Sequence, residues 1–556
     1  MKASLIFILI IFFNSSFAQY SRYIIEFKDK KGTTHSLNNP TTFLSNESIL
    51  RKKTFNIVID SSDLPVSKNY VDSISRFSDV KLLYTSRWMN LAVIQTTNQS
   101  SIDKIKSLDF VKKQYPIANT LIQLHASEIE SNIVKTNIPQ QNETSNDNTL
   151  QYGKSQAQIT IHEGEFLHNR GFLGEGVKIA VFDGGFFKYL NHPAFDSIRK
   201  QNKIKYTWDF VSNDASVNED DPHGMNCLSI MGANLPGSFV GTSPHADYYL
   251  FRTEDARSEF PIEEVYWLIA AERADSIGAH IITSSLGYTT FDNSFFDHQY
   301  NDLNGTGTIV SKAASMAVAK GMIVTNSAGN EGDDPWKYIS APADGINVLA
   351  VGAINTSKQL AGFSGLGPSA DGRTKPDIVS VGVNTQLIAM DGTVGIGSGT
   401  SFSNPNIAGL IACLWQAFPE FSNLEIIQSV KKSSDQFLNP DNKKGYGIPN
   451  MRIAYLDLSL QREIRNAKRI LIEKNIKLYP NPVTTTGKIA YKSTASGLLS
   501  WKMINAVGQL IKADQLAVKK DEYYIIELGD LALAPRGKYF LVYQNGDEHG
   551  VLPFIK

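Results

Sequence analysis

The sequence predicts three folded parts in series: a small α+β domain, a large α/β domain with a mostly parallel sheet and helices on both faces, and a small all-β sandwich. Three patterns within the 556 residues support this order. The first part alternates in the order βαββαβ, and the middle part has apolar strands that run into polar turns and helices. The last part has only short strands separated by turns.

Residues 1–18 have the composition of a secretory signal peptide. A basic start precedes a nearly unbroken apolar run from Leu5 to Phe13, and Ser16 and Ala18 are small residues that suit cleavage before Gln19. The run is too short to span a bilayer comfortably, and no later stretch is long and apolar enough to do so. We therefore expect a soluble, exported mature protein.

Residues 19–118 predict a split ferredoxin-like unit. The pattern indicates strands at 23–27, 80–84, 90–95 and 111–117, and helices at 70–77 and 102–110. An insert, 28–68, separates the first strand from the first helix. The following residues, 119–150, include a polar run rich in Asn, Gln, Ser and Thr at 137–148, which predicts a linker accessible to proteolytic processing.

The large middle part carries four segments with the chemistry of acyl transfer. Two strands run into turns that present Asp183 and Asn330, and two helical runs begin close to His223 and Ser401. Acyl transfer needs an activated hydroxyl, a base, a carboxylate that orients the base, and donors for the oxyanion. The backbone N–H of a serine at a helix start is unpaired and can serve as one such donor.

Each of these residues also has a plain structural interpretation. Taken alone, Asp183 and Asn330 are turn residues beside glycine, His223 is a surface or cap residue, and the segment at Ser401 is a helix N-cap. All four in one ordered set, at domain-scale spacing, favour the catalytic interpretation.

The order Asp…His…Ser and the flanking residues resemble the subtilisin-like serine proteases, over roughly residues 152–458. The resemblance implies that Asp183 orients His223, that His223 is the general base, that Ser401 is the nucleophile and that Asn330 donates to the oxyanion. It also implies a substrate-pairing edge strand and one wall of the specificity pocket; these are Ser285, Leu286 and Gly287, and Ser327, Ala328 and Gly329. Polypeptides are the implied substrates, and the chemistry requires no cofactor.

Some residues depart from the family pattern. Met225 and Asn226 follow the His-Gly pair, and Phe402 to Asn406 differ from the usual run after the nucleophile. None of these changes removes a proton-transfer group, although they put the shape of the cleft in question. The alternative from another class is a non-catalytic secreted binding protein on a subtilase scaffold.

The position of the N-terminal domain resembles that of the inhibitory propeptide of these proteases. The resemblance implies that the domain assists folding and blocks the cleft until it is removed, so that the chain is made as an inactive precursor. The alternative is an unrelated small α+β domain.

The chain has two cysteines, too few for a disulfide framework. Cys227 follows His223 by one helical turn, and Cys413 lies further along the helix of Ser401. We expect two buried free thiols, with a disulfide between neighbouring helices as the alternative. A cysteine at this place after the histidine also resembles the thiol-sensitive branch of the family.

Two acidic loops of the middle part could hold structural calcium, which prefers hard oxygen ligands. One is 213–221, and the other carries Asp292, Asp297 and Asp302. The spacing matches no EF-hand loop, so a solvated acidic loop is the favoured interpretation, and we assign no metal ligand.

The C-terminal part begins with a charged helical connector, 459–475, and continues as strands at 488–491, 499–504, 523–528 and 539–543. The Leu-Tyr-Pro-Asn-Pro start at 478–482, the Asn-Ala-Val-Gly-Gln turn and the Gly-Lys-Tyr-Phe strand resemble the type A sorting domain of the type IX secretion system. Its closing residues are less basic than usual. Residues 476–556 thus imply passage across an outer membrane; a binding sandwich that stays attached is the alternative.

The net charge of −1 gives no electrostatic reason to expect nucleic acid or a membrane surface as a partner. The expected partners are polypeptide substrates, the chain's own propeptide and the type IX secretion machinery. We expect a monomer, exported to the periplasm and then extracellular or at the cell surface, with its catalytic domain at 151–458.

Overall fold

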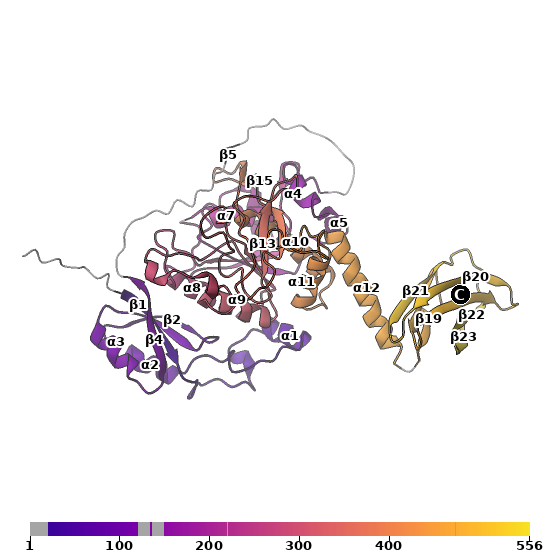
Figure 1. Ribbon diagram of the computed structural model, residues 1–556, viewed down its shortest axis with the longest axis horizontal. Coiled ribbons are helices and arrows are strands. Elements are labelled where there is room, and N and C mark those ends of the chain that lie inside the picture. The colour runs from indigo at the N-terminus through magenta and orange to yellow at the C-terminus, as the bar shows by residue number, and fades with distance from the viewer. Residues whose placement is uncertain (1–19, 120–133, 136–149, 220, 473) are drawn as a thin grey trace, which may run out of the picture. The chain divides into compact units, whose positions relative to one another are not determined.

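The computed structural model describes residues 20–119, 134–135, 150–219, 221–472 and 474–556 (Figure 1). It contains two compact units, which divide between Ala454 and Tyr455. The expected signal peptide and the polar run at 137–148 lie outside the described residues. Among the described residues, no helix combines the length and the apolar character needed to cross a membrane.

The N-terminal domain is the expected ferredoxin-like unit. Its antiparallel sheet has the order β2-β3-β1-β4, and helices α2 and α3 pack on one face through Ile74, Ile102 and Ile105. The strands are β1 (Tyr20–Phe27), β2 (Lys81–Ser86), β3 (Leu91–Gln95) and β4 (Val111–Asn119), and the helices are α2 (Lys68–Ser75) and α3 (Gln99–Lys106).

The insert of this domain forms helices that the sequence pattern did not predict. A short 3-10 helix (Pro40–Thr42) precedes α1 (Asn46–Thr54), whose N-cap Ser45 accepts a hydrogen bond from the Ser48 N–H at 3.1 Å. Arg51 and Lys52 of α1 are buried. A helix of nine residues with buried cations shows no apolar period, so periodicity could not reveal it.

The large domain is built on a sheet of parallel strands, which confirms the predicted α/β class. In spatial order the strands are β14 (Ile378–Val381), β13 (Leu349–Ile354), β12 (Ile323–Ser327), β11 (Ile281–Ser284), β6 (Lys178–Asp183), β10 (Asp247–Arg252) and β7 (Ile204–Asp209). Nearly all residues of the central strands are buried, as expected for a parallel sheet covered on both faces.

Helices cover the sheet, and smaller elements surround it. The longer helices are α7 (His223–Gly232), α8 (Ile262–Ser276), α9 (Ile309–Ala319), α10 (Thr400–Ala417) and α11 (Asn423–Lys432), and the shorter ones are α4 (Gln156–Thr160), α5 (Glu165–His168) and α6 (Asp196–Lys200). Two antiparallel pairs, β8 (Asn234–Leu235) with β9 (Phe239–Val240) and β15 (Thr385–Ile388) with β16 (Val394–Gly397), lie outside the main sheet, and β5 (Val134–Lys135) pairs with β16.

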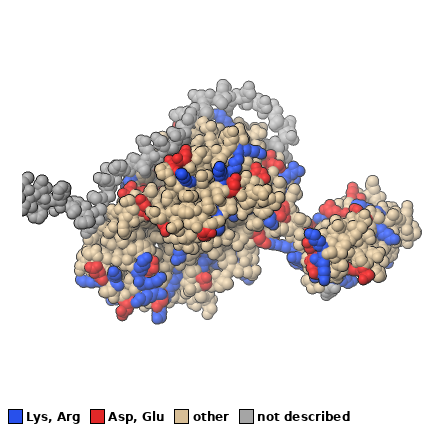
Figure 2. Space-filling view, in the orientation of Figure 1, with Lys and Arg blue, Asp and Glu red and all other residues tan. Residues whose placement is uncertain are grey.

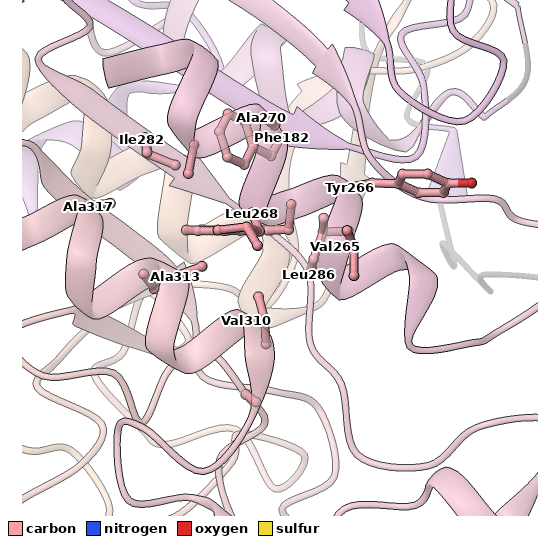
Figure 3. Packing of buried hydrophobic residues seen from close by; sticks show 14 of the residues in the cluster. Phe182, Val265, Tyr266, Leu268, Ala270, Ile282, Leu286, Val310, Ala313 and Ala317 are labelled. Atoms are coloured by element: carbon pink, nitrogen blue, oxygen red, sulfur yellow. The ribbon is translucent and has the colours of Figure 1, made fainter. Parts of the chain in front are cut away.

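A core of apolar side chains joins α8 and α9 to one face of the sheet. Leu268 of α8, Ala313 of α9 and Phe182 of β6 all belong to this cluster and are fully buried (Figure 3). Because successive strand residues point to opposite faces, Val181 points away from this core, and it is buried as well. Both faces of the sheet are therefore covered.

The C-terminal unit is a β-sandwich of one sheet with order β17-β18-β21 and a second with order β20-β19-β22-β23, around a core that includes Trp501, Leu541 and Tyr491. It comprises β17 (Ile476–Tyr479), β18 (Thr486–Lys492), β19 (Gly497–Asn505), β20 (Leu510–Val518), β21 (Tyr523–Asp530), β22 (Lys538–Asn545) and β23 (Glu548–Ile555). The prediction missed β20, whose residues are almost all exposed, and it treated β23 as a tail.

Residues 459–470 of the predicted charged connector belong to α12 (Met451–Ile470). The connector is not solvated throughout, because Ala467 and Leu471 form a buried cluster with Ala490 of the sandwich. On the face drawn in Figure 2, basic and acidic side chains are interspersed over the surface, in keeping with the near-zero net charge.

We expect Leu268→Ala to destabilise the large domain by about 2–5 kcal/mol, because it removes fully buried methyl groups between α8, α9 and the sheet. Urea unfolding of the variant, in a background that carries Ser401→Ala to prevent autolysis, measures this. Leu438→Ala is the control, since Leu438 is 87% exposed. Equal losses in both variants would contradict this account of the core.

Candidate active site

The predicted site residues lie where strands end and helices begin. Asp183 is the last residue of β6, His223 the first of α7, and Ser401 the second of α10. Because β6, β11 and β12 are parallel, their carboxyl ends meet at one edge of the sheet. The structure therefore places the ends of these strands side by side.

Asp183 and His223 form a buried hydrogen-bonded pair. The His223 Nδ1 atom lies 2.8 Å from Asp183 Oδ1, and the two side chains are 8% and 1% exposed. The helix approaches the strand closely at Gly224, where a Cβ atom would stand 2.4 Å from the Gly185 carbonyl oxygen and 2.8 Å from Asp183 Cβ. Glycine at this position is what lets α7 bring its first residue to Asp183.

The electrostatics of this pair favour a charged imidazole. Burial by itself lowers the pKa of His223, but the negative charge of Asp183, reinforced by Cys227, outweighs burial and holds the pKa well above its ordinary value of 6.5. An imidazolium at this position is therefore stabilised by its surroundings.

Ser401 contacts one of the predicted edge residues. Its Oγ donates a hydrogen bond to the Ser285 carbonyl at 3.2 Å, and its own carbonyl accepts one from Ser285 Oγ at 2.9 Å. Among the described residues, no hydrogen bond joins Ser401 to His223. The Ser401 backbone N–H lies in the first turn of α10, where helix N–H groups have no intrahelical partner.

Asn330 lies next to the same helix start, and it is exposed. Its Oδ1 accepts hydrogen bonds from the Thr400 backbone N–H at 2.8 Å and from Thr400 Oγ1 at 2.9 Å. Because the oxygen is occupied by these donors, the Nδ2 amide group is the end left to donate elsewhere. The sequence analysis missed Thr400 as a positioning residue, although it precedes the serine directly.

The two predicted substrate-binding segments are neighbours. The Leu286 carbonyl accepts hydrogen bonds from Asn326 Nδ2 at 2.9 Å and from Ser327 Oγ at 3.4 Å. Ala328 and Gly329 continue directly from β12, and Gly287 follows Leu286 after β11. The edge segment and the pocket segment therefore lie at the carboxyl ends of adjacent parallel strands.

The residues that depart from the family pattern are buried. Met225 and Asn226 are fully buried, and the Asn226 amide donates to the Ile388 carbonyl at 2.7 Å. Phe402 packs against Cys227, Ile230 and Leu387. Their role is to pack α7 and α10 and to tie α7 to β15.

Both cysteines are buried free thiols, as expected. Cys227 Sγ lies 3.9 Å from His223 Nδ1 and 3.4 Å from the Ser401 carbonyl oxygen. Cys413 Sγ instead contacts the Thr242 carbonyl at 3.2 Å. The Cys227 thiol thus lies beside the candidate site, whereas the Cys413 thiol contacts the Thr242 carbonyl.

Among the described residues, the carboxylates of the two acidic loops do not form a group of three that could share one ion. These carboxylates cap nearby backbone groups: Asp297 accepts from the Phe291 N–H, and Asp221 accepts from the His223 N–H. Three acidic residues that the sequence did not single out do converge: Glu254, Glu259 and Glu263 place carboxylate oxygens within 4.8 Å of one another. Burial raises the pKa of Glu259 to about 8.

Comparison with known families divides the chain into three matched segments. Residues 174–447 match the subtilase family, residues 22–136 match the peptidase S8 propeptide domain of Bacteroidota, and residues 477–555 match the secretion system C-terminal sorting domain. The matches cover all three folded parts of the structure.

Individual proteases are similar to the large domain. Subtilisin NAT from Bacillus subtilis subsp. natto is 27% identical over 310 residues, which cover 55% of this chain and 71% of the relative. Subtilisin BL from Lederbergia lenta is 28% identical over 288 residues, which cover 52% of this chain and 93% of the relative.

These matches, together with the parallel sheet and its site, define a serine endopeptidase. Residues 174–447 form a subtilase domain, which follows a peptidase S8 propeptide domain and precedes a type IX sorting domain. The sorting domain directs the protein to the cell surface or the extracellular space.

We expect a mercurial such as p-chloromercuribenzoate to inhibit the mature enzyme, because a metal on Cys227 Sγ would displace the His223 ring beside it. Cys227→Ser should abolish the inhibition in a peptidase assay. Cys413→Ser is the matched control and should remain sensitive, since Cys413 contacts Thr242 instead. Persistent inhibition of Cys227→Ser would contradict the assignment.

Proposed function

We propose that the chain is an inactive precursor of a secreted endopeptidase that hydrolyses peptide bonds with Ser401 as nucleophile, His223 as general base and Asp183 as the orienting carboxylate. The observation that carries this proposal is the buried 2.8 Å bond between Asp183 and His223 at the end of β6. It fixes the imidazole by Nδ1 and leaves Nε2 for proton transfer.

The proposed reaction follows from these groups. Ser401 Oγ turns from the Ser285 carbonyl toward His223 Nε2 and attacks the peptide carbonyl carbon, while His223 takes its proton. The imidazolium so formed is stabilised by Asp183, and it then gives the proton to the leaving amine. Water repeats the same sequence on the acyl-enzyme and releases the second product.

The negative charge that develops on the carbonyl oxygen would be met by two donors. The Ser401 backbone N–H lies at the positive end of α10, and Asn330 presents Nδ2 because Thr400 holds its Oδ1. Both donors are positioned before substrate arrives, which is the condition for stabilising the transition state more than the ground state.

Substrate binding is proposed at the two neighbouring segments. An extended peptide would pair with Ser285, Leu286 and Gly287, and the side chain before the scissile bond would lie along Ser327, Ala328 and Gly329. Backbone pairing gives affinity with little sequence selectivity. The position of Ser285 beside Ser401 supports this arrangement, since it brings the edge segment to the nucleophile.

The precursor is proposed to consist of a signal peptide (1–18), an inhibitory propeptide (19–118), a processing region (119–150), the catalytic domain (151–458), a connector (459–475) and the sorting domain (476–556). The packing of the N-terminal sheet on the large domain supports the inhibitory role: Trp88 and Val93 share one core with α8. The catalytic unit is proposed to act as a monomer, and structural calcium remains a prediction.

We expect Ser401→Ala to leave the purified precursor full length and inert towards casein, with a fall in kcat on the order of 10⁶-fold, a magnitude taken from another subtilase. Intact mass spectrometry follows loss of the propeptide, and casein cleavage follows activity.

Ser403→Ala is the matched control, since Ser403 is buried in the same helix and its Oγ donates only to the Thr400 carbonyl. It should mature like the wild type. A wild-type chain that stays inert after its propeptide has been removed would instead support the non-catalytic binding protein.

The pH profile of kcat/KM provides a separate test. His223 must be neutral to accept a proton, and its pKa is raised, so activity should fall as the pH drops through a value above 6.5. Asp183→Asn removes the charge that raises this pKa, so its acid limb should move to lower pH, and kcat should fall about 10⁴-fold. An unchanged limb in the variant would show that Asp183 does not act on the titrating group.

A further inference from the structure

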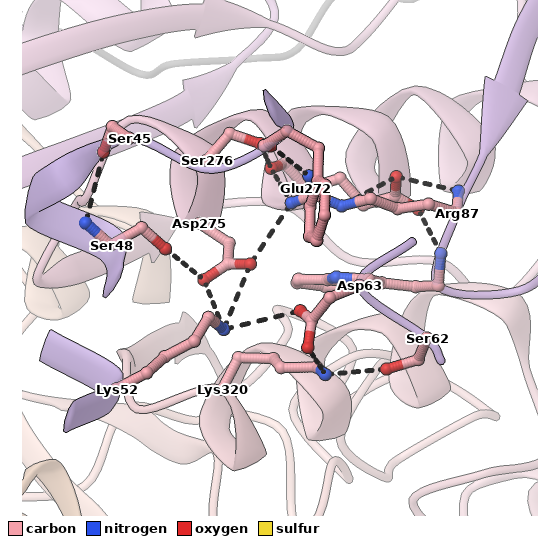
Figure 4. Close-up of polar contacts among 12 residues, drawn as sticks. Ser45, Ser48, Lys52, Ser62, Asp63, Arg87, Glu272, Asp275, Ser276 and Lys320 are labelled. Carbon is pink, nitrogen blue, oxygen red and sulfur yellow. Dashed lines mark hydrogen bonds and ion pairs between the residues drawn. The ribbon is translucent and has the colours of Figure 1, made fainter. Parts of the chain in front are cut away.

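The insert of the propeptide makes a polar interface with the catalytic domain that is separate from the packing of its sheet. Ser45 to Asp63, hereafter the clamp, contact the C-terminal ends of α8 and α9 (Figure 4). The Ser45 backbone N–H donates to the Ser276 carbonyl at 3.0 Å, and the Arg51 guanidinium donates to the Ala279 carbonyl. These carbonyls lie at and just beyond the end of α8, where the helix dipole favours cations.

Glycines at the two helix ends make room for the clamp. Gly278 has φ +78°, and a Cβ there would stand 2.6 Å from Glu47 Cβ. Gly321 has φ +92°, and a Cβ there would stand 2.4 Å from the Ile57 Cδ1 atom. Glycine therefore has two roles at the ends of α8 and α9: it ends each helix, and it leaves space for the clamp.

Charges of opposite sign meet across this interface. Lys52 Nζ lies 3.0 Å from Asp275 Oδ1, and Arg51 also pairs with Asp275. From the turn that follows β2 of the propeptide, Arg87 adds a third cation 3.2 Å from Asp275 Oδ2, and its backbone N–H donates to Glu272 at 3.0 Å. All three cations that pair with the Asp275 carboxylate among the described residues therefore come from the propeptide.

The second half of the network has the opposite polarity. Lys320 of the catalytic domain places Nζ 2.8 Å from Asp63 Oδ2 and 3.2 Å from Asp60 Oδ1 of the clamp. Asp63 also lies 3.5 Å from Lys52, so the two halves are linked. Lys52, Asp63 and Asp275 are each at most 1% exposed. Reversed pairs of this kind fix the register of two surfaces.

Such buried pairs slow dissociation, because each charge must regain water before the surfaces separate. The apolar contact of the sheet has no such directional requirement. We propose that the clamp is a second binding contact between the propeptide and the catalytic domain. Its charge network sets how long the excised propeptide stays bound and inhibits the enzyme. This inference rests on the proposed function as a self-processing precursor.

Substitutions in the clamp test this proposal, because they are removed together with the propeptide and leave the sequence of the mature enzyme unchanged. Full-length Lys52→Met is compared with Lys53→Met, which replaces the neighbouring lysine of α1, an exposed residue. Intact mass spectrometry gives the time at which the propeptide is cleaved, and a fluorogenic peptide substrate gives the time at which activity begins. We expect the interval between the two to shorten at least about tenfold in Lys52→Met and less than about twofold in Lys53→Met. Equal intervals would overturn the proposal.

Hydrogen exchange on full-length chains that carry Ser401→Ala gives a second readout that needs no activity. Lys52→Met, and Asp63→Asn as the second variant, should exchange faster within residues 45–63, while β11 and β12 stay protected. Exchange throughout the chain in both variants would overturn the proposal, since the clamp would then belong to the folding core. A wild-type precursor that never cleaves itself refutes the proposed function instead, and the exchange comparison still tests the clamp.

Discussion

The arrangement of this protein depends on the parallel direction of the strands in its central sheet. Parallel strands end at the same edge, so Asp183 at the end of β6 and the segments that follow β11 and β12 meet there without long loops. The helices that begin with His223 and Thr400 start at the same edge. An antiparallel sheet of the same residues would send alternate strand ends to opposite sides, and the site would not form.

Buried charge is used in two different ways in the same molecule. At the candidate site, Asp183 is paired with one ionisable ring, and its negative charge stabilises the imidazolium form of His223. At the propeptide interface, Asp275 is compensated by three permanent cations. Such a group does not act on a proton; it holds two surfaces in one register.

Under the proposed function, these two uses let the precursor be folded and inactive at the same time. The propeptide covers α8 and α9 through an apolar face and a polar clamp, and the Asp183–His223 bond is already formed in its presence. Removing the propeptide therefore requires no rearrangement of that pair. The residues that differ from the family pattern, such as Phe402, lie inside this scaffold and support the helices that carry the site.

The amino-acid pattern alone predicted the α/β class, the ferredoxin-like unit, the sandwich and the candidate site residues, because short-range features carry that information: strand periodicity, a helix start at Ser401 and turns after strands. The remaining features depend on contacts between distant parts of the chain. The cations of helix α1 are buried, and no apolar period in the sequence predicts this. The exposed strand β20 has no alternation of apolar and polar residues. The roles of Thr400, Asp275 and Lys320 depend on partners at least 70 residues away along the chain, and only folding brings those charges together.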